Sequence, residues 1–374
     1  MQISIGFGPL KWHRDEMIGM PTGVAPICFR SREDLVVTFV TREAPGSLPR
    51  RERPDEPLPY RLHALFVNVK SGRLRATREW PTASEKAGVM PATEGNFVML
   101  TPDKLTLYSS ELRPIGNLDI FLTHRAHEDW WHVQRSPNGR SILIDYAEDS
   151  RYYGFQWVSL DDLRVLRTWR EDGSENLWRG PEDLNIRGGR YGSIYEDEMV
   201  TWIYKDFFLT RRLDGPWKLV RFSRPVDNLG AFGFLSSQIL ISVRLSEPGH
   251  WKGKITLIRK SGEVLFEEEF PEREWFTYLP SSGDGRRFAL AIERGKGGSR
   301  PLDIHPHYSL SRLSVFDLPS RRWVYKLEAK THGIKSISGL ALSPDGSLLA
   351  LINQDGVLEL YRLPDTPTVP QSVQ

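Results

Sequence analysis

The feature that most constrains the fold is a strand–turn–strand unit that recurs along the chain. Each copy has two short apolar runs, rich in β-branched and aromatic residues, on either side of a polar turn. Six copies occur, at residues 65–80, 105–118, 157–169, 207–222, 255–270 and 313–328. Their turns fall near residues 71, 109, 161, 214, 261 and 319, so the spacing ranges from 38 to 58 residues. A repeat of this length, allowing for loop insertions, predicts the four-stranded blades of a β-propeller.

A second recurring unit is a tight turn followed by an apolar strand, at residues 136–147, 282–292 and 343–353. Asn138-Gly139 and Asp345-Gly346 favour such turns, because both positions of these dipeptides tolerate positive φ. We interpret this unit as the link between the first and second strands of a blade. The more frequent unit then joins the third and fourth strands. No helical stripe of apolar residues extends beyond two turns, so we expect an all-β fold.

The segment 331–365 carries the most complete blade pattern. His332-Gly333 precedes its first strand, Ser343-Pro344-Asp345-Gly346 forms its first hairpin, Asp355-Gly356 forms the second, and Tyr361 ends its third strand. This segment resembles a WD40-type blade. The chain has no Trp-Asp dipeptide, and the other units lack the histidine. The resemblance implies a WD40-like or related β-propeller.

The count of strands predicts how the last blade is completed. After Tyr361 the chain becomes rich in proline, so the last blade lacks a fourth strand of its own, and an open sheet edge is a liability. We expect the N-terminal segment 3–8 to supply that strand and close the ring. Seven blades result, with six or eight as alternatives because residues 172–200 are irregular. The length of 374 residues suggests two or three domains, or one large all-β domain. The expected organisation is one propeller over residues 1–365 and a flexible tail over 366–374.

Two insertions interrupt the predicted blades. Residues 43–60 carry several prolines and charges of both signs, and residues 293–309 form a second long loop. Long loops on a rigid scaffold often bind ligands, but they also tolerate sequence drift. Both interpretations stay open.

The composition and the N-terminal sequence limit the classes of partner and the cellular locations that we expect. The 50 Lys and Arg residues nearly balance 48 Asp and Glu residues, for a net charge of +2, so no nucleic acid or other polyanionic partner is indicated. Cys28 is the one cysteine, which excludes an internal disulfide. The N-terminus does not fit a secretory signal, and no run of about 18 apolar residues suggests a membrane helix. We expect a soluble, cytoplasmic monomer, or an extracytoplasmic protein if a signal precedes Met1.

Two histidine groups are candidate metal sites. The first comprises His124, His127 and His132 with Glu128 and Asp129, and the second comprises Asp303, His305 and His307. The first lacks the four-residue histidine spacing of a helical zinc site. Pro306 makes an extended chelating strand unfavourable in the second. We therefore expect surface loops and no bound metal.

Other patterns that can carry chemistry have simpler structural explanations. The glycines of 295–299 could cradle a phosphate, but no Walker pattern is present. The acidic runs 196–198 and 267–269 could pair a general acid with a base, although exposed charges at turns and edges explain them as well. No nucleophile elbow occurs. Cys28 lies in an apolar strand and is expected to be an inert core thiol.

Tryptophans recur at the spacing of the blades. Trp80, Trp169, Trp217 and Trp323 fall on or near predicted fourth strands, where we expect them to fill space between blades. Stacking on a carbohydrate or another ligand is the alternative. The better candidates for an exposed site depart from this spacing: Trp130, Trp131, Trp178 and Trp251.

The sequence favours a non-enzymatic propeller that presents loops to a protein or peptide partner. The alternative is a propeller enzyme, such as a hydrolase, lyase or quinone-type enzyme, or a small-ligand binder that uses the central channel. Fold alone does not decide between these classes. No catalytic residue, ligand-binding residue or cofactor is assigned from the sequence.

Overall fold

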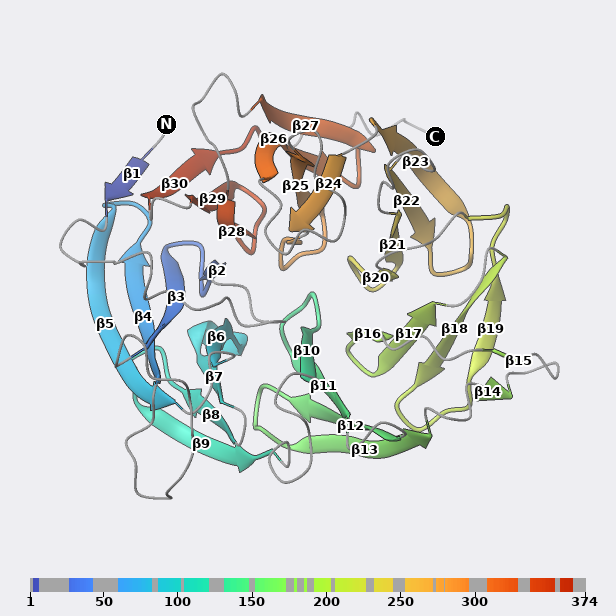
Figure 1. Cartoon of the computed structure of the whole chain (residues 1–374), viewed down its shortest axis with the longest axis horizontal. Helices are drawn as coiled ribbons and strands as arrows, with labels where there is room; N and C mark the ends of the chain where they lie inside the picture. Colours follow the sequence, from blue (N-terminus) through green and yellow to red (C-terminus); the bar gives the residue numbers. More distant parts are fainter. Residues whose placement is uncertain are drawn as a thin grey trace, which may run out of the picture. The chain divides into compact units, whose positions relative to one another are not determined.

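The computed structural model contains β-strands almost exclusively (Figure 1). It describes residues 3–6, 27–42, 60–82, 87–101, 104–120, 131–147, 152–172, 178–179, 185–186, 192–202, 206–226, 232–244, 253–271, 274–278, 280–295, 308–328, 337–353 and 357–365. Internal contacts divide the chain into two compact units. One comprises residues 3–175 and 356–358, and the other comprises 1–2, 176–355 and 359–374.

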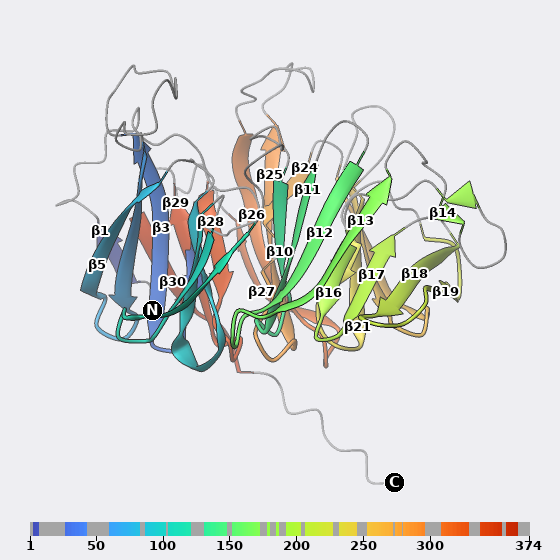
Figure 2. The ribbon, with the colours of Figure 1, turned by 90° about the horizontal axis from the view of Figure 1, so that it is seen from below.

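The first unit contains three four-stranded antiparallel sheets, which we call blades 1 to 3 and which Figure 1 colours from blue to green. Blade 1 has β2 (Ile27–Phe29), β3 (Asp34–Arg42), β4 (Tyr60–Asn68) and β5 (Arg73–Thr82). Blade 2 has β6 (Gly88–Pro91), β7 (Phe97–Thr101), β8 (Lys104–Tyr108) and β9 (Pro114–Asp119). Blade 3 has β10 (Trp131–Arg135), β11 (Ser141–Ala147), β12 (Tyr152–Ser159) and β13 (Val165–Asp172), seen side by side in Figure 2.

The second unit contains blades 4 to 6 and most of blade 7. Blade 4 has β16 (Gly192–Tyr195), β17 (Glu198–Trp202), β18 (Phe207–Arg212) and β19 (Lys218–Arg221). Blade 5 has β20 (Phe232–Phe234), β21 (Ile239–Arg244), β22 (Gly253–Arg259) and β23 (Val264–Phe270). Blade 6 has β24 (Glu274–Tyr278), β25 (Arg287–Gly295), β26 (Tyr308–Asp317) and β27 (Arg322–Glu328).

Blade 7 combines the two ends of the sequence. It has β28 (Ile337–Leu342), β29 (Leu348–Asn353) and β30 (Val357–Arg362), and β1 (Ile3–Gly6) is the fourth strand beside β30. The sheet order β1-β30-β29-β28 confirms the predicted use of the N-terminal segment. The fold is an all-β propeller of seven four-stranded blades, as predicted.

Within the described ranges, a small hairpin and a 3₁₀ turn lie outside the strands of the blades. Strands β14 (Trp178–Arg179) and β15 (Asn185–Ile186) form a small hairpin in the region predicted to be irregular. A single 3₁₀ turn, η2 (Thr93–Gly95), joins β6 to β7. The proposed tail 366–374 lies outside the described residues, as do residues 43–59 and 296–307, which form most of the two insertions.

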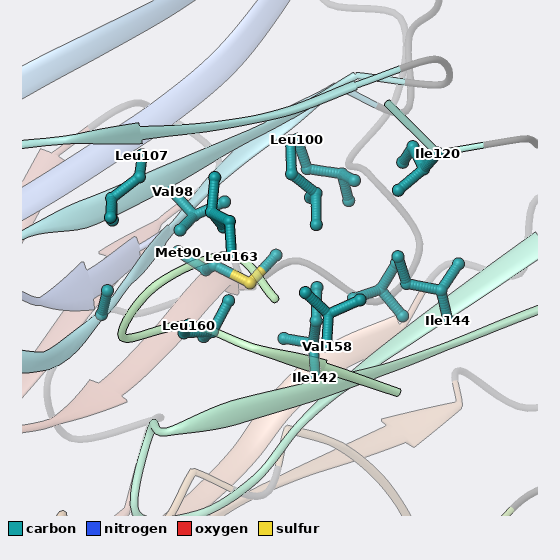
Figure 3. Close-up of a cluster of buried hydrophobic side chains, with 13 residues drawn as sticks. Met90, Val98, Leu100, Leu107, Ile120, Ile142, Ile144, Val158, Leu160 and Leu163 are labelled. Carbon is teal, nitrogen blue, oxygen red and sulfur yellow. The ribbon is translucent and has the colours of Figure 1, made fainter. Parts of the chain in front are cut away.

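Apolar side chains pack between neighbouring blades. In the close-up of Figure 3, Met90, Val98 and Leu107 of blade 2 face Ile142 and Val158 of blade 3. These five side chains are almost inaccessible to solvent. Blades 6 and 7 share a similar cluster. Successive side chains of a strand point to opposite faces of the sheet, so every blade can supply side chains to both of its neighbours.

In blades 1 to 6, the turn between the first and second strands lies beside the turn between the third and fourth, and we call this end of the blade the turn end. In blades 1 and 3 to 6, a backbone hydrogen bond joins the two turns. In blade 3, the Leu160 N–H donates to the Arg140 carbonyl over 2.8 Å. Equivalent bonds occur in blade 1, from Val69 to Glu33, and in blade 6, from Leu318 to Arg286.

Candidate functional site

Most of the two histidine groups lies outside the described residues. His124, His127, Glu128 and Asp129 lie outside the described residues, as do Asp303, His305, His307 and the segment 296–299. His132 lies in β10. Within the described parts of the chain, no group of three or more His, Cys, Asp or Glu side chains is placed to hold a metal ion.

One acid of each acidic run, Glu198 and Glu267, forms ion pairs with cations. Glu198 accepts hydrogen bonds from the Thr210 hydroxyl over 2.6 Å and from the Lys260 ammonium of blade 5. Glu267 lies 2.8 Å from Lys254 Nζ and 2.6 Å from an Arg224 Nη atom. These contacts favour structural roles within blade 5 and between blades 4 and 5.

The expectation that these acids are exposed is wrong for three of them. Glu198 and Glu267 have side chains that are 12% and 17% exposed. Glu268 is half-buried and accepts a hydrogen bond from the Trp323 indole of blade 6. The sequence could not indicate these partners, because each comes from a neighbouring blade or strand.

Cys28 is a protonated thiol packed in blade 1. It lies in β2 against the apolar cluster between blades 1 and 2 and is half-buried. Burial raises the pKa of the Cys28 thiol to about 12, although the positive charges of Arg135 and Arg30 oppose this shift. Because the thiolate is the nucleophilic form, these surroundings support an inert thiol.

Two of the periodic tryptophans contact a neighbouring blade. The Trp80 ring of β5 lies 5.6 Å from the Tyr108 ring of blade 2, and Trp323 bonds to Glu268 of blade 5. Trp169 instead stacks on Phe155 of its own blade at 4.9 Å. Trp217 lies under the Arg211 guanidinium, 4.5 Å from it and within blade 4.

Among the remaining tryptophans, Trp131 lies in β10 and Trp178 in β14. Trp130 and Trp251 lie outside the described residues. The proposal of an exposed aromatic site therefore stays a prediction.

Side-chain hydrogen bonds fix the turns between first and second strands. In blade 3, the Ser136 hydroxyl donates to Asn138 Oδ1 over 2.7 Å and accepts the Ser141 N–H over 3.0 Å. Asn138 Oδ1 also accepts the Arg140 N–H over 3.2 Å. The same bonds recur in blade 6, around Ser282 and Asp284, and in blade 7, around Ser343 and Asp345. These turns make the turn end a rigid surface.

Arg135 ends β10 immediately before this turn and reaches toward blade 2. Its Nε donates to the Pro91 carbonyl at the end of β6 over 2.9 Å. Gly139 has φ of +74°, and a Cβ atom there would lie 2.0 Å from Arg135 Nη2. The glycine therefore provides both the turn conformation and the space for the guanidinium.

The guanidinium of Arg135 has no carboxylate partner among the described residues. Arg30 and Arg75 both bind Asp34, whereas the one hydrogen bond of Arg135 to a described residue runs from Nε to the neutral Pro91 carbonyl. The residue is exposed, yet the surrounding protein removes enough water to lower the pKa of Arg135 to about 10. The group is still charged at neutral pH. A partly desolvated guanidinium binds an anion more strongly than one surrounded by water, because the local dielectric is lower.

The sequence predicted the turn that follows Arg135, but Arg135 was not among the candidate binding residues. Alignment of the three turns with each other contains the signal, because Ser281 and Leu342 occupy the corresponding position before Ser282 and Ser343. A charged residue in one copy of a repeat, where the others have small or apolar residues, marks a position that the repeat itself does not require.

Comparison with known proteins identifies the fold. No protein-family model matches the chain, and no curated protein matches it. Among solved structures, the C-terminal WD40 domain of Sif2 matches with a TM-score of 0.51 and 11% identity, covering 94% of this chain and 97% of that domain. The chain is therefore a WD40-like β-propeller, and at this identity the likeness shows the fold alone. No helix in the described ranges is long and apolar enough to cross a membrane.

Proposed function

We propose that the protein is a binding module that holds a protein or peptide partner at the turn end of blades 2 and 3. The observation that carries this proposal is the Arg135 guanidinium, which Pro91 and Gly139 position and which no described carboxylate neutralises. A guanidinium with free Nη donors matches the planar oxygens of a carboxylate. The preferred partner would therefore present an Asp or Glu side chain, or a terminal carboxylate.

The surroundings of Arg135 support recognition by a preformed surface. Three hydrogen bonds fix the adjacent turn, so little backbone entropy is lost when a partner binds. Thr93 of η2 donates to Asp161 over 2.6 Å and links blades 2 and 3 on the same side. WD40-type propellers commonly act as interaction scaffolds, which is an argument from fold alone.

Binding of a labelled acidic peptide tests this proposal. The probe is a short peptide with alternating Asp and Gly residues, followed by fluorescence anisotropy with the full chain. Arg135→Met should weaken binding by about tenfold or more, because one charge-assisted bidentate contact is lost. Arg140→Met is the matched control, since Arg140 is an exposed arginine in the same turn.

Equal losses for the two variants would indicate a general charge effect and contradict the proposal, as would unchanged binding by Arg135→Met. Cross-linking in extracts from the native source gives a second measurement. A protein captured by the parent chain and by Arg140→Met, but not by Arg135→Met, would support the assigned surface.

A further inference from the structure

Blade 1 carries a hydrogen-bonded series of hydroxyl, imidazole and carboxylate that the proposed binding function does not use. The Thr41 hydroxyl of β3 lies 2.8 Å from His63 Nε2 of β4. On the other side of the ring, His63 Nδ1 lies 3.3 Å from Glu79 Oε1 of β5. His63 is directly opposite Phe39 on one side and Glu79 on the other, so three adjacent strands hold the series in register.

The hydrogen bonds determine the state of the imidazole. A carboxylate only accepts hydrogen bonds, so Nδ1 carries the proton that faces Glu79, and Nε2 accepts from the Thr41 hydroxyl. Burial lowers the pKa of His63 below its ordinary value, although Glu79 opposes this shift. The ring is therefore neutral at pH 7. The Phe39 ring stacks on it at 4.6 Å with an angle of 6° between the planes, which fixes its orientation.

Three other blades have a permanent cation at this position of the third strand. The position of His63 is occupied by Lys104 in blade 2, Lys254 in blade 5 and Arg312 in blade 6. Each lies opposite an acid on the fourth strand, as His63 lies opposite Glu79. Those blades place a permanent cation directly across from a carboxylate in the strand register. A neutral histidine cannot supply the positive charge that Lys or Arg has at this position. Blade 1 therefore differs from these three blades, because its imidazole can accept and release a proton near neutral pH.

The series is accessible from solvent. Thr41 is half-buried, the His63 side chain is 15% exposed, and the Glu79 side chain is 50% exposed. Arg61, directly opposite Thr41, lies 3.6 Å from Glu79 and adds a positive charge at this end of the blade. A nucleophile, a base and a group that orients the base are the three parts that activate a hydroxyl for acyl transfer.

We propose that Thr41 is a nucleophile for small carboxylic esters, with His63 as its general base and Glu79 and Phe39 as positioning residues. Thr41 Oγ1 forms a bond to the ester carbonyl carbon, and its proton moves to His63 Nε2. The bond from carbon to the leaving oxygen then breaks, and that oxygen takes the proton from Nε2 and departs as an alcohol. Water, deprotonated by His63, attacks the acyl-Thr41 ester. The carboxylic acid leaves, and the proton returns to Thr41.

Acetylation by p-nitrophenyl acetate tests this assignment with the full chain. The expected result is p-nitrophenol release together with one acetyl group on the peptide that contains Thr41, measured by mass spectrometry. Thr41→Val should remove both signals while its shape and packing are kept, and Thr41→Ser should retain them. His63→Gln should reduce the rate by about a hundredfold or more. Thr210→Val is the matched control, because Thr210 bonds to Glu198 with no histidine present.

The pH dependence distinguishes a base from a structural histidine. The rate should be constant at neutral pH and fall only as the pH drops through a pKa below the ordinary histidine value of about 6.5. Glu79→Gln should lower the rate at every pH without changing the unfolding temperature by more than a few degrees. Equal rates for the parent chain and a folded Thr41→Val variant, or acetylation confined to lysines, would overturn the proposal. Neither outcome bears on Arg135, so the two proposals fail separately.

Discussion

Arg287 shows how one buried side chain can connect two blades. Its Nε lies 3.2 Å from Asp317 Oδ1 in blade 6, and its Nη atoms donate to the carbonyls of Gly346 over 2.9 Å and Pro364 over 2.8 Å. The side chains of Arg287 and Asp317 are 5% and 0% exposed. The sequence predicted the turn and apolar strand of residues 282–292, and Arg287 begins that strand, but nothing in the sequence indicated a buried ion pair.

Arg287→Ala should destabilise the protein by about 3–5 kcal/mol, because Asp317 would keep a buried charge without its counter-ion. Arg287→Lys should also destabilise it, since one ammonium cannot reproduce the fork of the guanidinium. Urea unfolding followed by tryptophan fluorescence measures both changes. Arg286→Ala, at the exposed neighbouring position, is the control and should cost less than about 0.5 kcal/mol.

Asp317 makes part of the stability dependent on pH. Burial by itself disfavours the carboxylate, but hydrogen bonds from Ser320 and Arg287 outweigh this effect, so the pKa of Asp317 lies below its ordinary value. The carboxylate therefore stabilises the fold fully above the unfolded-state pKa of about 3.9, and this contribution is lost as the pH falls through the lower folded-state pKa. The difference in unfolding free energy between the parent chain and Asp317→Asn should be largest near pH 7 and shrink below about pH 4. A difference that stays constant down to pH 3 would contradict this assignment.

The polar residues that make the two proposed sites differ in how far the sequence could reveal them. Arg135 stands out once the turns are aligned, because the repeat has Ser281 and Leu342 at the same position. Thr41, His63 and Glu79 are separated by 22 and 16 residues and become neighbours only through strand register. A single sequence gives the strands but not their exact pairing, so this series could not be predicted.

At the scale of strands and turns, the sequence predicted most of the fold. All six expected hairpins between third and fourth strands occur, and so do the three links between first and second strands. Short apolar runs and Gly-containing turns carry this information locally. The sequence does not indicate the β-bulges. In five blades the pairing between the third and fourth strands shifts register, beside Phe66, Leu107, Trp157, Leu257 and Val315.

The turn of blade 5 at residues 260–263 shows why contacts between blades are harder to predict. Gly262 has φ of +91°, and a Cβ atom there would lie 1.9 Å from the Arg221 carbonyl oxygen of blade 4. The Gly262 carbonyl also accepts the Ser223 N–H over 2.8 Å. The sequence indicates a glycine turn, but it does not indicate that the turn packs against the backbone of another blade.

Gly262→Ala should destabilise the protein by more than about 1 kcal/mol, because alanine disfavours positive φ and its methyl group would collide with backbone atoms. Gly215→Ala is the control. Gly215 lies in the corresponding turn of blade 4, where the nearest atom to an added Cβ is Arg212 Cβ at 3.5 Å, an ordinary contact. Thermal unfolding of the two variants measures the difference. Similar losses would show that the contact between blades 4 and 5 contributes little.

At the scale of the whole molecule, the N-terminal strand decides whether blade 7 is complete. β1 covers β30, which otherwise ends the sheet with unpaired backbone groups. Deletion of residues 1–6 should lower the unfolding temperature and increase aggregation measured by light scattering. Adding a synthetic peptide of residues 1–8 should partly restore both. A deletion variant that stays monomeric with an unchanged unfolding temperature would show that β1 is dispensable.

The number of blades followed from the repeat spacing and from the missing last strand, both of which are properties of the sequence. The function did not follow in the same way, because the same fold supports many activities. The residues that distinguish this chain are those that depart from the repeat, such as Arg135 and His63. They can be recognised only after the blades have been aligned with each other.

The pairing of β1 with β30 also determines when the protein can finish folding during its synthesis. β1 ends at Gly6 and β30 begins at Val357, so β1 is synthesised long before its partner strand. Until β30 has been synthesised, β1 cannot form this pairing. The nascent chain therefore carries an unpaired β1 during that time, and chaperones or early interacting proteins can bind it before blade 7 assembles.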